Sequence, residues 1–283
     1  MKKVFCIILT ALALLSLTAC TPGNLPEVCF VLENSDIVSI SLEMSKWFDE
    51  PAADSTRPAT VNVVINGNTL TGTYKNSQYN SLSPEKKHNY AAGEYESFSV
   101  DDSGKVIFYI KYNPAGGEAV EKAKAEEIAR NFVKDLYPDV DLSGYTVSNN
   151  LDSSSGVYTV SFIKYAGERI TIDHVSVNVA GGGEVTQFSA FMFGRIATDA
   201  FDGIDYGKLK TKLTAKCDAL LGKVKKDYDS VVYDDYQYIL TLDEAGKPAV
   251  VTLVEIKLQT EHDSVVSAHT VDIGLYFTES VMK

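Results

Sequence analysis

The stretch from Ile170 to Phe193, ITIDHVSVNVAGGGEVTQFSAFMF, decides the expected fold class. Both halves of this stretch alternate apolar and polar residues, and alternation with a period of two is typical of half-buried β-strands. The glycines at positions 181–183 separate the halves, and glycine adopts the backbone conformations that a tight turn needs. We therefore expect two consecutive antiparallel strands, Ile170–Val179 and Val185–Phe193.

The alternation changes phase at one point in the first of these strands. Ile170 and Ile172 follow one phase, whereas Val175 and Val177 follow the other. A β-bulge at His174, which inserts one extra residue, is the simplest explanation, and it makes His174 a structural residue. We interpret the other histidines in the same way, because no two of them have the i and i+4 spacing of a zinc site. They are His88, His262 and His269.

Two helices are predicted on either side of this stretch, at about 118–136 and 206–224, because apolar residues recur there every three or four positions. Each predicted helix is followed by three predicted strands, so the order of elements occurs twice. The expected fold class is therefore α+β, with tandem units in which one helix covers one antiparallel sheet. The strands are 158–162, 170–179 and 185–193 in the first unit, and 236–240, 250–258 and 265–276 in the second.

The region before the first helix is expected to consist of β-hairpins. Asn66-Gly67 lies between alternating runs at 61–65 and 69–74, and Asn-Gly is a strong hairpin signal because both residues tolerate positive φ. A second hairpin is predicted from 98–100, a turn at Asp101-Asp102-Ser103-Gly104, and 106–112.

The hydrophobic pattern of the central region resembles that of the PepSY group. Small residues in the helix around Ala123–Phe132 precede an aromatic strand, Tyr158–Phe162, then ITIDHVSV at 170–177 and Gly183-Glu184-Val185. More narrowly, the pattern is similar to the propeptide-like repeats of YcdB/YcdC-type proteins. It departs from that family where Ala166-Gly167-Glu168 replaces the usual Asn-Gly. The resemblance implies cystatin-like units and a non-enzymatic role, in which an extracytoplasmic domain binds and restrains a peptidase or senses ligands.

The N-terminus has the three parts of a secretory signal. Met1-Lys2-Lys3 is basic, the run from Val4 to Leu17 is apolar and too short to span a bilayer, and small residues follow. Leu17-Thr18-Ala19-Cys20 resembles the bacterial lipobox, which implies cleavage before Cys20 and lipidation of its thiol. Lipid chains would then anchor the protein outside the cytoplasm, at the cell membrane or outer membrane.

These patterns divide the chain into four predicted regions. Residues 1–19 are the signal peptide, and 20–27 are the lipidated cysteine with a short tether. Residues 28–198 contain the β-rich region and the first helix-on-sheet unit, and 199–283 contain the second. The net charge of −12 disfavours binding to nucleic acid, because acidic surfaces repel phosphates.

Two local patterns leave structural alternatives open. Cys29 and Cys217 would both be exported, and such a pair can form a disulfide. Cys217 also lies on the apolar stripe of the second helix, where a free thiol behaves as a small hydrophobe. Asp139–Gly144 matches the first half of a calcium-binding EF-hand loop, but Asn150 stands where the bidentate Glu is needed. A turn with solvated aspartates is the preferred interpretation.

No catalytic motif is present in the sequence. It has no Gly-x-Ser-x-Gly elbow and no His-Glu-x-x-His, and no Lys-Ser or Lys-Thr pair comes directly after the glycine run at 181–183. We therefore predict no enzyme activity, catalytic residue, metal or cofactor. The predicted function is a lipid-anchored extracytoplasmic module that engages a protein partner such as a peptidase. The alternatives are a small-ligand-binding lipoprotein, with an apolar pocket between helix and sheet, and an envelope hydrolase whose triad is assembled in space.

Overall fold

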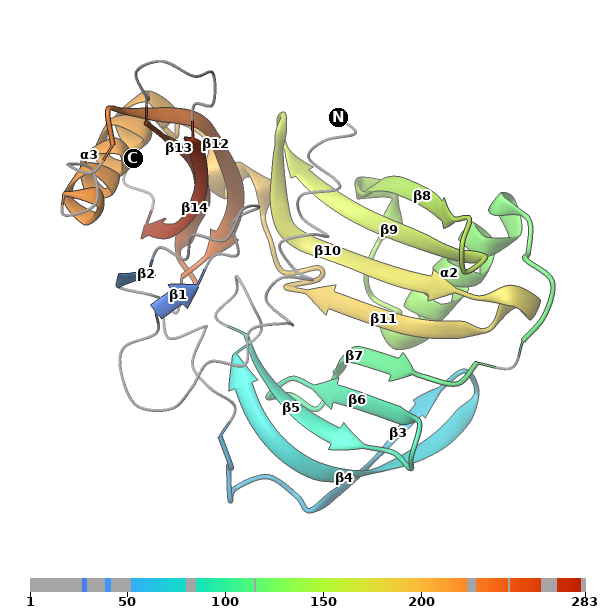
Figure 1. Ribbon diagram of the computed structural model, residues 1–283. Coiled ribbons are helices and arrows are strands. Elements are labelled where there is room, and N and C mark those ends of the chain that lie inside the picture. The colour runs from blue at the N-terminus through green and yellow to red at the C-terminus, as the bar shows by residue number, and fades with distance from the viewer. Residues whose placement is uncertain are drawn as a thin grey trace. The chain divides into compact units, whose positions relative to one another are not determined.

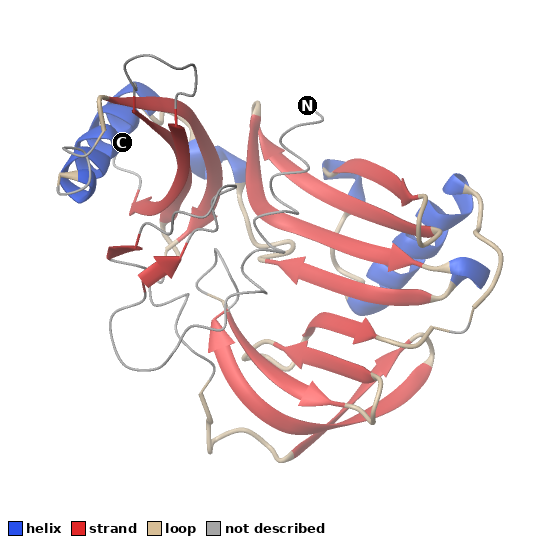
Figure 2. Cartoon of the chain, viewed as in Figure 1, coloured by secondary structure: helices blue, strands red, loops and turns tan. Residues whose placement is uncertain are grey.

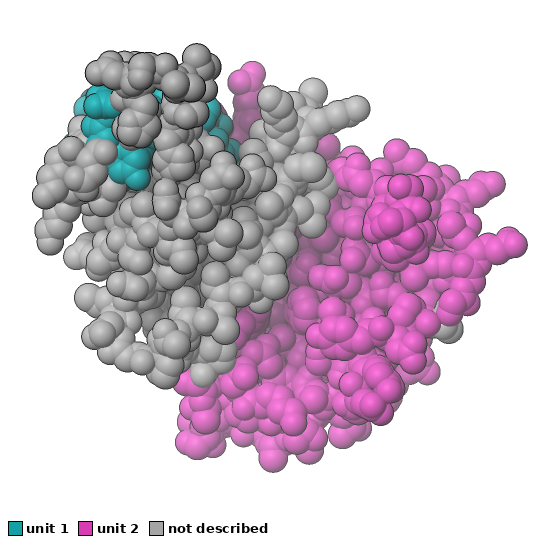
Figure 3. Space-filling model, viewed as in Figure 1, with its two compact units in different colours: residues 1–46, 203–239, 249–283 teal, residues 47–202, 240–248 magenta. Residues whose placement is uncertain are grey.

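The structure is a computed structural model that describes residues 27–29, 39–41, 52–79, 85–114, 116–222, 228–243, 245–260 and 269–280 (Figure 1). Strands predominate among these residues (Figure 2). The chain divides into two compact units, coloured separately in Figure 3. Unit 1 comprises residues 1–46, 203–239 and 249–283, and unit 2 comprises 47–202 and 240–248. Within the described ranges, every helix is too short or too polar to cross a membrane.

Unit 2 is built on one antiparallel sheet with the strand order β8-β9-β10-β11-β7-β6-β5-β4-β3. Neighbouring strands in the first half of the unit are joined by hairpins, whereas β7 pairs with β11 across the segment that contains helix α2 (Lys122–Leu136). The strands are β3 (Thr60–Ile65), β4 (Asn68–Tyr79), β5 (Lys86–Ala91), β6 (Glu96–Val100), β7 (Val106–Lys111), β8 (Thr146–Asp152), β9 (Val157–Ala166), β10 (Arg169–Val179) and β11 (Val185–Phe191).

Both predicted hairpins of the N-terminal region are confirmed. Asn66 and Gly67 have φ values of 54° and 73°, the paired positive values that a type I′ turn requires between β3 and β4. The second hairpin joins β6 to β7, and Gly104 in its turn has a φ of 85°. A strand can reverse within so few residues only where the backbone enters the left-handed region, and these residues enter it at low cost.

The strand pair that decided the expected fold class is also confirmed. β10 pairs antiparallel with β11, and the glycines between them form a short 3₁₀ turn in which Gly182 and Gly183 have positive φ. The pairing of β10 with β9 shifts register between Ile170 and His174, where residues 171–173 stand opposite Lys164 alone. An irregularity is therefore present just before His174, but it inserts two extra residues and not the one that was predicted. After the shift, Val175, Val177 and Val179 are fully buried in the core cluster, whereas Ile170 before it is only partly buried.

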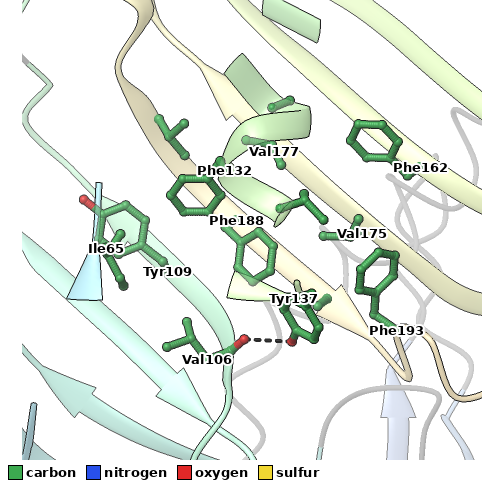
Figure 4. Packing of buried hydrophobic residues seen from close by; sticks show 14 of the residues in the cluster. Ile65, Val106, Tyr109, Phe132, Tyr137, Phe162, Val175, Val177, Phe188 and Phe193 are labelled. Atoms are coloured by element: carbon green, nitrogen blue, oxygen red, sulfur yellow. Dashed lines mark hydrogen bonds between the residues drawn. The ribbon is translucent and has the colours of Figure 1, made fainter. Parts of the chain in front are cut away.

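The core of unit 2 lies between α2 and the sheet. Ala125 and Ala129 are fully buried on α2, and their small side chains let the helix approach the strands closely. Phe132 packs on Phe188 of β11, with ring centroids 5.4 Å apart (Figure 4). At the C-terminal end of the helix the Tyr137 hydroxyl donates to the Val106 carbonyl at 2.8 Å, which ties the helix to β7.

Unit 1 contains helix α3 (Tyr206–Leu221) and the antiparallel strands β12 (Ser230–Leu242), β13 (Pro248–Thr260) and β14 (His269–Ser280), of which the end of β12 and the start of β13 belong to unit 2. Leu213, Cys217 and Leu221 are fully buried along one face of α3, as its apolar stripe predicts. Lys212 and Lys216 of α3 both bind the buried carboxylate of Glu279 in β14. The short strands β1 (Glu27–Cys29) and β2 (Ser39–Ser41) pair antiparallel.

The expected tandem arrangement of cystatin-like, PepSY-like units, each with one helix covering its own sheet, is wrong. The structure is mostly antiparallel sheet, and α2 lies mainly against β8, β9 and β10 of the nine-strand order given above. Val63, Tyr90 and Phe98 from β3, β5 and β6 join the same buried cluster as α2. Hydrophobic periodicity reports which residues of an element face inward, but not which elements share a core. The hairpins therefore extend the helix-covered sheet and do not form a separate region.

Candidate polar network in unit 2

A serine, a histidine and an aspartate are hydrogen-bonded in a row in unit 2. Ser77 Oγ lies 2.7 Å from His88 Nδ1, and His88 Nε2 lies 3.0 Å from Asp102 Oδ1. Strand pairing explains why they meet. Ser77 stands directly opposite His88 where β4 pairs with β5. His88 stands opposite Val100 of β6, and the β6–β7 turn carries Asp102 from there to the free nitrogen of the imidazole.

The row continues beyond the serine. The Tyr74 hydroxyl is 2.7 Å from Ser77 Oγ, and it accepts the Asp54 backbone N–H at 2.9 Å. Burial lowers the pKa of His88, so the imidazole is neutral at neutral pH. A neutral imidazole next to the Asp102 carboxylate carries its proton on Nε2 and accepts from Ser77 through Nδ1. The hydrogen bonds therefore run in one direction: the Asp54 N–H donates to Tyr74, Tyr74 to Ser77, Ser77 to His88, and His88 to Asp102.

Charged side chains surround the exposed end of this network. Arg57 binds Asp102, and its Nε atom is buried with no hydrogen-bond partner. Asp54 lies 3.5 Å from Arg57 and 3.6 Å from Lys86. Hydrogen bonds from Thr56 lower the pKa of Asp54 to about 2, so this carboxylate stays ionised across the physiological range.

The order serine, histidine, aspartate is that of a hydrolase triad, but the geometry is that of a closed network. Ser77 is 3% exposed and His88 is 0% exposed. Ser77 Oγ already bonds Tyr74 and His88, so a substrate carbonyl has no approach to it. A nucleophile must reach the reacting atom within hydrogen-bonding distance of its base. The network is therefore suited to holding Asp102 in place and not to attacking a substrate.

A second charged cluster adjoins the first through consecutive residues of the β6–β7 turn. Arg195 binds Glu85 at 3.2 Å and Asp101 at 2.5 Å, and both carboxylates are buried. Asp101 also accepts from the backbone N–H groups of Ser103 and Lys105, which closes the turn. Two buried carboxylates are stable here because one guanidinium and several N–H donors satisfy them.

Backbone strain is present beside Arg195. Met192 has a φ of 46°, and left-handed conformation is unfavourable for a side chain with a Cβ. Its backbone N–H points to Glu85 at 3.5 Å. Strained residues of this kind persist only where the surroundings hold them, and they cluster at functional positions. Met192, Arg195, Lys86 and Asp102 contribute to the wall of one depression of about 310 Å³.

Some of the residues predicted from the sequence to have a special role lie within the described ranges, and others lie outside them. The predicted lipidation site, Cys20, lies outside the described residues, as do His262 and the side chains of His269 and Cys29. Cys217 is a buried free thiol, and burial raises its pKa to about 12. His174 stacks on Phe191 with ring centroids 4.7 Å apart.

The loop with partial EF-hand spacing forms a turn. Asp141 accepts from the Ser143 N–H at 2.9 Å and from its hydroxyl at 2.7 Å, which caps the 3₁₀ turn Leu142–Gly144. This is the solvated-aspartate turn preferred from the sequence. Across the described ranges, no three His, Cys, Asp or Glu side chains are grouped as a metal site requires.

The space between α2 and the sheet is filled. Phe132, Phe162 and Phe188 are buried there, in the place where the small-ligand alternative expects an apolar pocket between helix and sheet. A polar depression of about 230 Å³ lies elsewhere in unit 2. In it, the Tyr109 hydroxyl donates to Glu96 at 3.0 Å and Lys111 binds Glu184 at 2.5 Å.

Sequence reasoning did not find the Ser77–His88–Asp102 network. The sequence patterns indicate a structural role for His88 and a turn position for Asp102, and nothing in them joins the two residues. The three residues are separated by 11 and 14 positions, and they meet only through the register of β4, β5 and β6. The hairpin predicted at 98–112 is the one sequence signal related to the network, because it places Asp102 in the turn between two strands.

Comparison with known proteins gives structural similarities only. No family model matches the chain, and no curated protein matches it. The C-terminal domain of YpeB from Bacillus megaterium is similar with a TM-score of 0.32 and 10% sequence identity, over 79% of this chain and 88% of that chain. An uncharacterized protein from Eubacterium rectale ATCC 33656 is similar with a TM-score of 0.29 and 12% identity, over 78% of this chain and 73% of that chain. Both TM-scores are below 0.5, so neither similarity carries functional weight.

Proposed function

We propose that this protein is a lipid-anchored extracytoplasmic module that engages and restrains a protein partner, such as a peptidase, at the cell envelope. The leader and the Leu17–Cys20 motif support the lipid anchor, and the PepSY-like pattern of the central region supports the partner class. The proposal places the partner's contact at the depression beside Asp102 and Arg195.

The observation that carries this placement is that two exposed charged side chains, Asp102 and Arg195, are each bound by buried side chains. The Asp102 side chain is 64% exposed and that of Arg195 is 45% exposed. Buried His88 bonds Asp102, and the buried carboxylates of Glu85 and Asp101 bind Arg195. Side chains held rigidly before binding lose little conformational entropy when a partner docks, and arginine is enriched among residues that dominate binding energy.

The depression fits one anchoring side chain of the partner, since about 310 Å³ is at the lower end of the range for small-molecule sites. Flanking surface would supply the rest of the interface. The closed Ser77–His88 pair favours this binding role over the hydrolase alternative, because a binding role needs Asp102 to be fixed but needs no access to the serine.

Site-specific photocrosslinking in living cells tests the proposal. A photoreactive residue at the exposed position Ser103, beside the depression, should capture one defined protein, which mass spectrometry identifies. The same residue at Glu168, in the exposed β9–β10 turn, is the matched control. Asp102→Asn keeps the acceptor for His88 but removes the charge, and it should reduce the capture at 103. Equal capture at both positions, or none above background, would refute the partner role.

The anchor and the restraining action have separate tests. Mass spectrometry of the natural product should find a diacylglyceryl group on the Cys20 sulfur, and a bare thiol or a retained leader would overturn the anchored placement. If the captured protein is a peptidase, adding the purified chain should lower its activity, and the Asp102→Asn chain should do so less effectively. Unchanged peptidase activity would limit the role to binding.

A further inference from the structure

The β3 strand forms an exposed edge of the unit 2 sheet. In the described part of the chain, β3 pairs with β4 on one side and has no partner strand on the other. The register pairs Thr60 with Thr73 and Ile65 with Asn68, with no shift between them. An unpaired strand presents a row of N–H and C=O groups that can pair with another chain.

The hydrogen-bonding phase identifies the groups that face outward. Tyr74 donates its backbone N–H to the Ala59 carbonyl at 2.9 Å, so this pair is of the hydrogen-bonded kind. Antiparallel pairs alternate, so Val61, Val63 and Ile65 also bond β4. The N–H and C=O groups of Thr60, Asn62 and Val64 therefore point away from the sheet.

The edge lacks the features that usually block pairing. The sequence from Pro58 to Tyr74 has no charged residue, although charged residues make up 23% of the chain. The strand itself contains no proline and no bulge, and Val64 is 61% exposed. Proteins commonly protect edges with lysines, prolines or bulges. At the opposite edge, Asn149 of β8 donates its amide to the Lys122 carbonyl of α2, so that strand is tied to the helix.

We propose that β3 is a self-association edge, at which two copies of this chain pair β3 with β3 in antiparallel fashion about a two-fold axis at Asn62. This register sets Asn62 opposite Asn62 of the second copy, and Thr60 opposite its Val64. Each outward N–H and C=O of these residues then gains a partner, and the interface is isologous as two-fold symmetry requires.

Charge favours a second copy as the occupant. A chain with a net charge of −12 repels its own copies over most surfaces. The uncharged hairpin removes that repulsion at β3, and its two nearest charged residues in the sequence, Arg57 and Lys75, are both positive. The inference is independent of the proposed function, because β3 contributes no residue to the depression beside Asp102.

Sedimentation of the full chain in detergent tests the self-association. The wild-type chain and Val64→Thr, which keeps the backbone N–H and a β-branched side chain, should form dimers as the concentration rises. Val64→Lys should weaken dimerisation about tenfold or more. Each dimer contains the lysine twice, once opposite Thr60 of either copy, so the interface is disturbed at two positions. Circular dichroism confirms that the lysine variant is folded, as the exposure of Val64 leads us to expect. A wild-type chain that stays monomeric, or a lysine variant that dimerises equally well, would overturn the proposal.

Crosslinking tests the register. Asn62→Cys should give a dimer with a short bis-maleimide, above the background from the native cysteines, whereas Glu168→Cys should not. Hydrogen exchange tests the occupant, because the peptide containing residues 60–65 should become protected as the pure protein is concentrated. Protection that arises only when membrane extract is added would show that another protein occupies the edge, and would refute pairing between copies.

Discussion

Two histidines are buried in unit 2, and for both of them burial is the largest influence on the pKa. His174 stacks on Phe191 and bonds the Ile172 carbonyl through Nδ1 at 3.1 Å. His88 is held between Ser77 and Asp102. Burial lowers the pKa of each, and it lowers the pKa of His174 to about 4. Both residues therefore stabilise the fold in their neutral forms.

The free energy of unfolding of unit 2 should consequently fall in acid, and the part of this loss that is due to His174 can be calculated. Its folded pKa of about 4 is below the unfolded value of 6.5, so the unfolded chain binds a proton first as the pH falls. This contribution is fully present above pH 6.5 and is lost between 6.5 and 4, by roughly 3 kcal/mol. Chemical denaturation at several pH values measures the loss. His174→Phe keeps the ring stack and should have the flatter profile, and parallel profiles would contradict the assignment.

A single glycine is required at the centre of β4. A Cβ atom on Gly72 would lie 2.5 Å from Phe98 Cζ and 2.7 Å from Tyr90 Cβ, within the core under the N-terminal hairpin. Gly72→Ala should therefore lower the free energy of unfolding by about 1–3 kcal/mol, because overpacking displaces two buried aromatic rings. Denaturant melts measure the change, with Thr71→Ala on the exposed face as the control. An alanine variant as stable as the wild type would mean that the hairpin moves away from Tyr90 at little cost.

At the scale of elements, two loops of unit 2 pass each other backbone to backbone. The segment leading into α2 crosses the β10–β11 turn, where Gly182 donates its N–H to the Glu118 carbonyl at 2.8 Å. A Cβ on Gly117 would lie 2.7 Å from Gly182 N, whereas a Cβ on Gly116 would meet nothing within 4 Å. The glycine run recognised in the sequence therefore serves close packing between loops.

This crossing predicts a difference between two adjacent glycines. Gly117→Ala should separate the loops, and should speed hydrogen exchange at the start of α2 and at the β10–β11 turn, with a stability loss of about 1–3 kcal/mol. Gly116→Ala adds the same methyl group without the clash, so its exchange should match the wild type. If the two substitutions change hydrogen exchange and stability equally, the cause is the lost backbone freedom of glycine and not the close approach of the loops.

The elements that the sequence predicted are those with a local signal. Asn66-Gly67 specifies a turn whatever surrounds it, and the phase change at His174 marked the irregularity in β10. β5 and β8 were not predicted individually, because KKHNYA and TVSNNLD contain no apolar alternation. In β5 the inward residues are His88 and Tyr90, which are buried through hydrogen bonds and ring stacking. The polar network escaped prediction for the same reason, since it depends on register between strands.

At the scale of the whole molecule, the two units draw on interleaved parts of the chain. The large buried cluster consists of residues from unit 2, whereas unit 1 buries its own apolar residues on α3 and β13. Val254, Ile256 and Leu258 line the buried side of β13. Compact units of one chain can open separately, with different free energies.

Glu279 provides a test of that independence. Its buried carboxylate bonds Lys212 and Lys216, which joins the last strand to α3 within unit 1. Glu279→Gln keeps the shape but removes the charge, and it should destabilise unit 1 by about 1.5–3 kcal/mol, because hydrogen bonds to buried charged groups are lost.

The expected signature of Glu279→Gln is faster hydrogen exchange in α3, β12 and β13, with α2 and β8–β11 unchanged. Asp234→Asn is the matched control, because it removes an exposed pair with Lys257 in the same unit, and such surface pairs contribute at most about 1 kcal/mol. If Glu279→Gln instead speeds exchange equally in α2, the two units unfold together. The chain would then unfold in one cooperative transition, although it divides into two compact units.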